Sequence, residues 1–171
     1  MKKFREINPL EFNESPFRLI GKEWMLITAG NMENWNTMTA SWGGMGEIWF
    51  KPAVFTFIRP QRHTLKFVEK EPVFTLSFFD EKYRTALKIC GAHSGRDCDK
   101  AAEAGLTPFG TDGGSVAFEE ARLVLECRKL YVQDLDPAGF LDDSIIPKHY
   151  PARDFHRMFV GEVLKMLCKA E

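Results

Sequence analysis

The chain has 171 residues, a length typical of one domain, and we expect residues 1–171 to form a single domain. Its formal net charge of −1 argues against a broad nucleic-acid-binding surface, and its 44% hydrophobic and 27% charged residues are typical of a soluble globular protein. No apolar run is long enough to span a membrane, and the N-terminus "MKKFREINPLEF" lacks the apolar segment of a signal peptide. We therefore expect a cytoplasmic protein that contacts neither nucleic acid nor membrane.

Six segments rich in apolar, β-branched and aromatic residues are predicted as strands. In chain order they are "WMLITAG" at 24–30, "NTMTASWGG" at 36–44, "AVFTFIRP" at 53–60, "PVFTLSFFD" at 72–80, "ARLVLECRKLYV" at 121–132 and "FHRMFVGEVLKML" at 155–167. The polar stretch "NMENWN" at 31–36 indicates a turn between the first two.

Short helices are predicted from capping residues and from apolar residues spaced along one face. One starts at Pro16 with Ser15 as its cap, and another covers 63–70 with Thr64 as its cap. A third covers 83–91 and is closed by Gly91, and a fourth runs from a cap at Asp97 to Gly105. Strands that pair mostly with distant segments, together with a few short helices, favour an α+β fold built around a closed or half-open β-barrel.

The strand at 36–44 carries small hydroxyls at alternate positions, Thr37, Thr39 and Ser41, and is followed by Trp42 and two glycines. One explanation is a solvent-facing strand surface, because threonine favours strands in any case. The other is a binding surface, on which hydroxyls and backbone groups bond the polar edge of a planar ring while aromatic side chains cover its faces. Aromatic residues are 13% of the chain, which suits both a packed β core and such a site.

Two other segments have the composition of an anion site. "RPQRHT" at 59–64 gathers Arg59, Arg62 and His63 just before a helix start, where phosphate is favoured by the helix dipole and by guanidinium forks. "CGAHSGRDCDK" adds Ser94, Arg96 and Lys100. A solvated basic turn is the alternative interpretation of the first segment.

Four cysteines lie at positions 90, 98, 127 and 168, without paired spacing. Cys90, His93 and Cys98 suggest zinc, but structural zinc sites prefer C-x2-4-C pairs and four ligands. We interpret the cysteines as reduced thiols of a cytosolic protein and expect no metal.

The motifs "NTMTASWGGMG", "PAVFTFIRPQRHT", "FTLSFF", "SGRDCDK" and "DFHRMFVGEV", in this order, resemble the flavin reductase-like family with the FMN-binding split barrel, in particular its flavoredoxin-type members. The resemblance runs from about Trp24 to the C-terminus and implies FMN as cofactor. It implies that Asn36, Thr37, Met38, Thr39, Ala40, Ser41 and Trp42 run along the isoalloxazine ring. It further implies that Arg59, Pro60, Arg62, His63 and Thr64 lie by the ribityl phosphate.

The resemblance also implies a catalytic histidine. The family's aspartate–histidine element has its counterpart in Asp154 and His156, with one residue inserted between them. From the residue alone, a satisfied core or surface histidine is the alternative.

The activity that the resemblance implies is electron transfer through bound FMN in a homodimer, with NADH or NADPH as donor and free flavin, ferric iron or a redox protein as acceptor. The sequence contains no G-x-G-x-x-G motif, so no Rossmann nucleotide domain is expected. This leaves two alternatives: a flavoredoxin-like electron carrier reduced by a partner protein, and a protein that binds flavin without turnover. Aromatic content supports the dimer, because a monomer would have to expose a large apolar area.

Overall fold

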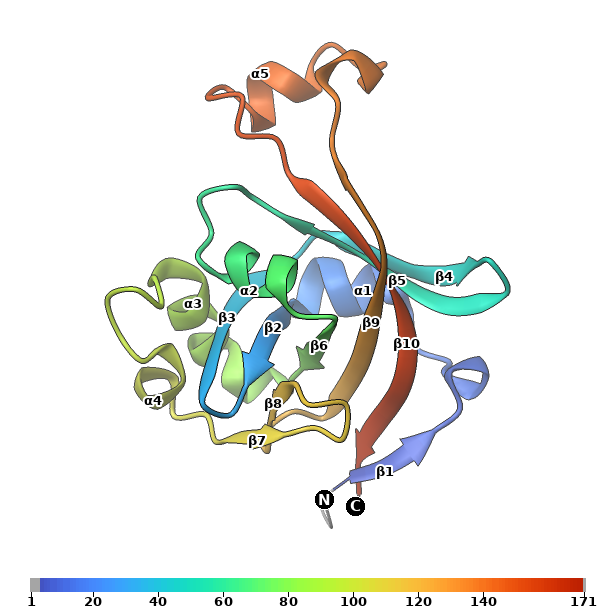
Figure 1. Ribbon diagram of the computed structural model, residues 1–171, viewed down its shortest axis with the longest axis vertical. Coiled ribbons are helices and arrows are strands. Elements are labelled where there is room, and N and C mark those ends of the chain that lie inside the picture. The colour runs from blue at the N-terminus through green and yellow to red at the C-terminus, as the bar shows by residue number, and fades with distance from the viewer. Residues whose placement is uncertain (1–3, 171) are drawn as a thin grey trace.

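The computed structural model describes residues 4–170, which form a curled antiparallel sheet with short helices on its outside (Figure 1). The strands are β1 (Phe4–Ile7), β2 (Met25–Asn31), β3 (Asn34–Ala40), β4 (Gly43–Ile48), β5 (Lys51–Ile58), β6 (Val73–Phe78), β7 (Pro108–Gly110), β8 (Val116–Phe118), β9 (Leu123–Asp134) and β10 (Arg157–Lys169). The helices are α1 (Pro16–Arg18), α2 (Thr64–Lys70), α3 (Arg84–Ala92), α4 (Lys100–Ala104) and α5 (Ile145–His149). None of the helices in this part of the chain is long and apolar enough to cross a membrane.

The main sheet has the order β3-β2-β6-β9-β10-β5-β4, and β1 pairs with β10 on the side. Every pairing is antiparallel. β3 and β4 are the two ends of this order, although only Ser41 and Trp42 separate them along the chain. The sheet therefore curls into a split barrel, and the predicted α+β barrel fold is confirmed.

Strand β2 is buried on both faces, which explains why its sequence does not alternate. Ile27 packs into the barrel interior with Phe74 and Leu125. Leu26, on the opposite face, packs under the helices with Leu87. The sheet therefore separates two apolar cores, one inside the barrel and one between the barrel and α3.

Several predicted boundaries differ from the structure. The segment at 36–44 is two strands, since β3 ends at Ala40 and β4 starts at Gly43. The predicted turn at 31–36 is shorter, because β2 runs to Asn31 and β3 starts at Asn34. The turn is shorter because Asn31 and Asn34 pair across a tight hairpin. The segment 36–44 is divided because β3 and β4 do not continue each other but lie at opposite ends of the sheet order.

The predicted caps are also corrected. Asp97 does not cap α4; Asp99 does, accepting hydrogen bonds from two backbone amides of the first turn. The α2 cap position is His63, and Thr64 is already helical. α3 continues through Gly91 to Ala92. Gly105 ends α4 as predicted, at a φ of 66° that favours glycine.

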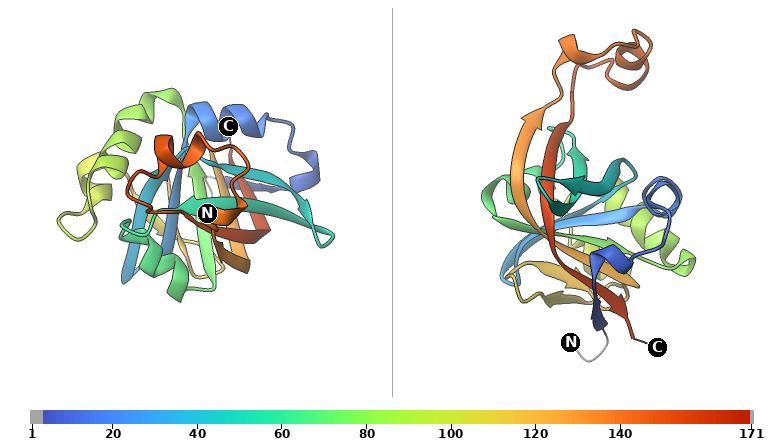
Figure 2. Two further views of the ribbon diagram at one scale, coloured as in Figure 1. Left: turned by 90° about the horizontal axis from the view of Figure 1, so that it is seen from above. Right: turned by 90° about the vertical axis from the view of Figure 1, so that its right-hand side faces the viewer.

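The segment from residue 135 to 156, which includes α5, projects away from the barrel at the far ends of β9 and β10 (Figures 1 and 2). Leu141 in this segment is 99% exposed. The long strand predicted at 155–167 is confirmed as β10, which runs from Arg157 to Lys169. The projecting segment itself carries Asp154 and returns the chain to His156 at the barrel rim.

Gly161 in β10 yields a prediction about stability. It lies at a break in register with β9, and a methyl group added there would lie 2.7 Å from Cζ of the buried Phe74. Gly161→Ala should therefore lower the free energy of unfolding by about 1–3 kcal/mol, the usual cost of overpacking. Unfolding of both proteins in urea measures this change in the free energy of unfolding.

Gly46→Ala in β4 is the matched control, because a methyl group there meets nothing within 4 Å. It should leave stability unchanged or slightly raised, since alanine loses less backbone freedom on folding. Equal stability of the two variants would contradict the packing described for β10.

Candidate functional site

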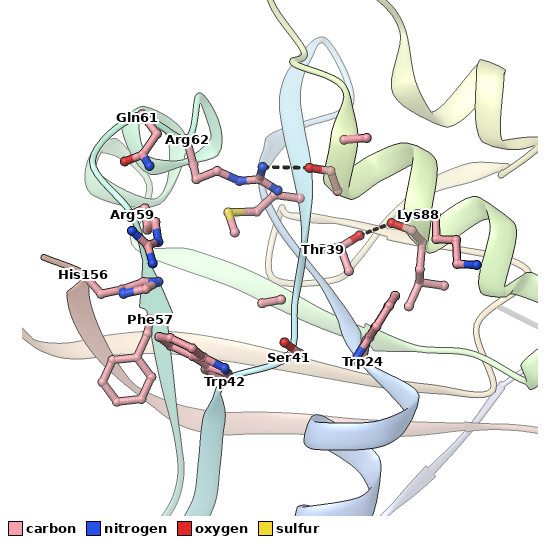
Figure 3. Close-up of a pocket in the computed structure, with 15 residues that line it drawn as sticks. Trp24, Thr39, Ser41, Trp42, Phe57, Arg59, Gln61, Arg62, Lys88 and His156 are labelled. Carbon is pink, nitrogen blue, oxygen red and sulfur yellow. Dashed lines mark hydrogen bonds between the residues drawn. The ribbon is translucent and has the colours of Figure 1, made fainter. Parts of the chain in front are cut away.

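A cavity of about 700 Å³ opens between the end of β3 and the face of α3 (Figure 3). This volume is within the usual range for small-molecule sites. We call it the β3–α3 cavity, and it is lined by Trp24, Met38, Thr39, Ala40, Ser41, Trp42, Phe57, Arg59, Gln61, Arg62, Leu87, Lys88, Gly91, Ala92 and His156. In the close-up, Trp42 and His156 lie on one side of it and Trp24 and Lys88 on the other.

The end of β3 forms one wall because β3 is an edge strand. β2 pairs with one side only, so the backbone groups on the other side bond no strand, and one of them, the carbonyl of Thr37, accepts from Lys100. The close approach of α3 depends on Gly91, whose added methyl group would lie 3.3 Å from Cβ of Thr39. Backbone donors and acceptors of β3 therefore border a slot with aromatic ends.

The hydroxyls of β3 are used mostly for structure. The Thr37 hydroxyl lies 2.8 Å from that of Thr28 and is buried. The Thr39 hydroxyl donates to the carbonyl of Leu87 on α3, at 2.5 Å. Ser41 lines the cavity, and no hydrogen bond joins its hydroxyl to residues 4–170. Of these three residues, Thr39 and Ser41 line the cavity and Thr37 does not, and among residues 4–170 only the Ser41 hydroxyl of the three has no hydrogen-bond partner.

The loop after β5 places its two arginines differently. Arg59 pairs with Asp154 and donates to the carbonyl of His149 at 2.8 Å, so its charge is already balanced. Gln61 donates to the same carboxylate at 2.8 Å. Arg62 instead donates to the carbonyl of Gly91 at 2.8 Å, a neutral acceptor. Within residues 4–170 it has no carboxylate partner, and burial lowers the pKa of its guanidinium.

His156 lies at the cavity wall and is 8% exposed. Its ring centroid is 5.0 Å from that of Trp42, and its Nδ1 is 2.8 Å from the Tyr150 hydroxyl. Burial, together with the positive charge of Arg59, lowers the pKa of His156 to about 4. A neutral imidazole follows, and we assign the more acidic phenol as the donor to Nδ1, which leaves the proton on Nε2. Asp154, its partner in the sequence motif, contacts Arg59 instead.

The remaining predicted site residues lie outside the cavity: Asn36, Thr37, Pro60, His63, Thr64, Ser94, Arg96 and Lys100. Two of them bond each other, because the Asn36 amide donates to the Thr64 hydroxyl at 2.8 Å. This hydroxyl is buried beside β3, so it is not a free helix-capping group that faces an anion. Lys100 extends to the carbonyls of Thr37 and Cys90.

Arg62, which lines the cavity, and three residues outside it, His63, Arg96 and Lys100, are close enough for their charges to affect one another, and we call this group the basic end. Burial, together with the positive charge of Arg62, lowers the pKa of Lys100 to about 8. Burial also lowers the pKa of His63, and the charges of Arg96 and Lys100 add to this effect. The buried Nδ1 of His63 has no hydrogen-bond partner in the part of the chain that the structure describes.

The sequence patterns missed the cavity residues Trp24, Phe57, Gln61, Leu87, Lys88, Gly91 and Ala92. The four on α3 are spaced i, i+1, i+4 and i+5, the pattern of one helix face. Such a face signals burial in general, and only the contact with β3 shows that it borders a cavity. Trp24 has a φ of 68° and packs under the guanidinium of Arg84, 4.3 Å from its ring centroid.

The sequence model described as "Flavin reductase like domain" matches residues 17–171. Among curated protein sequences, none matches this chain.

Solved structures are similar over most of the chain. An FMN-binding domain of a flavin reductase-like enzyme from Shewanella baltica OS155 is 15% identical with a TM-score of 0.70, covering 97% of this chain and 77% of that one. Flavoredoxin from Methanosarcina acetivorans is 19% identical with a TM-score of 0.65, covering 84% and 67%. An FMN-binding protein from Thermus thermophilus, with bound 1-cyclohex-2-enone, is 23% identical with a TM-score of 0.66, covering 97% and 79%. At these identities the likeness shows the fold.

The lowered pKa of His156 predicts its titration. The imidazole should take up its proton near pH 4, whereas the unfolded chain does so near 6.5. Because the unfolded chain binds more protons between these values, stability from this group is complete above about pH 6.5 and falls as the pH drops toward 4. An NMR titration, with His156→Gln to assign the resonance, measures the midpoint. A midpoint at or above 6.5 would contradict the burial of this ring.

Proposed function

The chain belongs to the family of the flavin reductase like domain, and from that premise we propose that it is an FMN-binding oxidoreductase that takes electrons from NADH or NADPH. The observation that carries the proposal is the β3–α3 cavity, which has aromatic walls, an exposed strand edge and a basic end. A planar ring with a phosphate tail needs these three features together.

The wall residues fit an isoalloxazine ring. Trp24 and Trp42 supply aromatic surface at the two sides of the slot (Figure 3). The backbone from Met38 to Trp42, on the free side of β3, supplies donors and acceptors for the polar ring edge. The Ser41 hydroxyl adds one more such group. These contacts would hold the ring flat against the strand.

The basic end fits the phosphate. Arg62 is the cavity-lining arginine without a carboxylate partner, whereas the charge of Arg59 is taken up by Asp154. Arg96 adds positive charge at this end, and His63 offers a buried ring nitrogen that has no partner within residues 4–170. A dianionic group placed here would relieve the repulsion among these cations.

When bound, FMN supplies the redox chemistry, accepting a hydride from the nicotinamide and passing electrons to free flavin, ferric iron or a redox protein. The chain itself orients the reactants. His156 is held by Tyr150 and Trp42 with a neutral ring, so its Nε2–H is a fixed hydrogen-bond donor at the cavity wall. We assign it to positioning the reductant or the ring edge.

A second candidate function is a flavoredoxin-like electron carrier, reduced by a partner protein. The chain has no G-x-G-x-x-G motif for a nicotinamide dinucleotide, and one of the similar structures is a flavoredoxin. The two candidates share the FMN site and differ only in the donor.

We also propose that the protein is a cytoplasmic homodimer. The four cysteines are free, as is usual in a reducing compartment. The projecting segment exposes Leu141, and the tip of the β4–β5 hairpin exposes Phe50 at 98%. A second copy that covers such side chains would remove them from water.

Light scattering tests the dimer. It should give twice the 19.6 kDa of one chain, and a single-chain mass at micromolar concentration would contradict the dimer.

The first functional prediction concerns cofactor and donor. Purified protein should be yellow and should release FMN on denaturation, in about one equivalent per chain. Under anaerobic conditions NADH or NADPH should bleach the flavin absorbance in the reductase case. If the flavin stays oxidised with both nucleotides but is reduced by dithionite, the result supports the electron carrier and not the reductase. Release of FAD, haem or no chromophore would contradict both.

The second prediction tests the basic end. Arg62→Ala should weaken the binding of FMN by roughly ten- to a hundred-fold, because a hydrogen bond to a charged group is worth about 1.5–3 kcal/mol. Riboflavin has the same ring without the phosphate, so its affinity should fall much less than that of FMN. Titrating both flavins into apoprotein measures the two affinities.

Arg18→Ala, which removes a surface arginine outside the cavity, is the matched control and should change neither affinity. Equal losses for both flavins in Arg62→Ala would assign this side chain to the ring. Unchanged affinity for both would leave it as a structural link to Gly91.

A further inference from the structure

A second group of chemically reactive side chains lies outside the β3–α3 cavity, in the connection between α3 and α4. His93, Cys98 and Glu103 each offer one donor atom there, and these three atoms lie within 4.8 Å of one another. Nδ1 of His93 is 2.7 Å from Oε2 of Glu103 and 3.9 Å from Sγ of Cys98. The sequence patterns suggested Cys90 as a partner of His93 and Cys98, but Cys90 is fully buried beneath α4.

The chain is folded so that these three residues meet. His93 is the residue that ends α3, and its amide donates to the carbonyl of Ile89. A tight turn follows, in which the carbonyl of Ser94 accepts from the amide of Cys98 and so returns the thiol toward His93. Glu103 reaches the same point from α4. The end of α3, the turn after it and α4, which follow one another along the chain, thus place these three side chains together.

Imidazole, thiolate and carboxylate are together the donor set that zinc-like ions prefer. Around a tetrahedral Zn²⁺ the donor atoms would be separated by about 3.3–3.6 Å, given the usual metal–ligand distances. The separations of 2.7 and 3.9 Å bracket this range, so shifts of less than 1 Å in exposed side chains are sufficient. The location at the surface gives an ion direct access and leaves the fourth position for water.

The charges around the cluster are mixed. Asp97 and Asp99 flank it, and Asp99 is used to cap α4. Lys100, the nearest buried cation, directs its ammonium inward to the carbonyl of Thr37 and so away from the cluster. The negative charge of Glu103 and of a Cys98 thiolate would compensate both charges of a divalent ion.

We propose that His93, Cys98 and Glu103 bind one divalent transition-metal ion of the zinc type. Such an ion would tie the end of α3 to α4. Because Gly91 and Ala92, in the last turn of α3, line the β3–α3 cavity, the ion would also hold that wall in place. This site is independent of the proposed function, since no residue of the triad lines the cavity.

Calorimetric titration of the purified full chain with Zn²⁺ tests the proposal. We expect one saturable equivalent per chain. Cys98→Ser, His93→Gln and Glu103→Gln should each weaken it by at least about 10- to 100-fold, the loss known even for residues that only orient metal ligands. Zn²⁺ should raise the melting temperature of the wild type, and of the ligand variants much less. All three residues are at least partly exposed, so melting of metal-free variants will show whether they fold normally.

Cys168→Ser is the matched control, because Cys168 is also free and partly exposed but lies in β10. It should bind Zn²⁺ as the wild type does. Co²⁺ gives an independent measurement: a four-coordinate thiolate site shows intense d–d bands at wavelengths beyond the flavin absorption, and these should vanish in Cys98→Ser. Absence of saturable binding, or equal binding by the wild type and Cys98→Ser, would overturn the proposal.

Discussion

The rest of the structure depends on the hydrogen bonds that polar groups on and around β3 make with the helices. β3 ends the sheet, and it is tied to three helices by hydrogen bonds instead of by another strand. Asn36 donates to Thr64 on α2, Thr39 donates to the carbonyl of Leu87 on α3, and Lys100 of α4 donates to the carbonyl of Thr37. A buried hydroxyl is costly unless it has a hydrogen-bond partner, and on β3 the hydroxyl of Thr39 bonds the carbonyl of Leu87 while that of Thr37 bonds Thr28.

The same contacts shape the β3–α3 cavity. They fix α3 beside β3 at one end of the strand, while Gly91 permits the close approach. Beyond Thr39 the helix and the strand separate, and Ser41 and Trp42 lead the chain across to β4 on the other side of the barrel opening. The cavity therefore lies at the split of the barrel, where an edge strand, two tryptophans and the arginine loop meet. We propose that flavin binds in this cavity, which the strands of the barrel do not close.

The sequence predicts this fold well where local patterns are sufficient. The strand at 121–132 and the helix at 63–70 are found as β9 and α2, and the family resemblance is confirmed by the match over residues 17–171. The site is predicted less completely, because its chemistry depends on contacts between distant segments. Thr37 and Thr39 have the residue type of ligand-binding groups, yet they bond Thr28 and Leu87. Lys100 has the charge expected of a phosphate contact, but its ammonium is directed into the protein.

A crystal structure of the protein with FMN tests the central claim most directly. The account predicts the isoalloxazine ring between Trp24 and Trp42, along the backbone from Met38 to Trp42, with the phosphate at the basic end and bonded to Arg62. A ring in this cavity whose phosphate points away from Arg62 would contradict the assignment of the basic end. Flavin bound elsewhere, for instance in the apolar pocket between the N-terminal segment and β4 that Leu10 and Met45 help to line, would contradict the account as a whole.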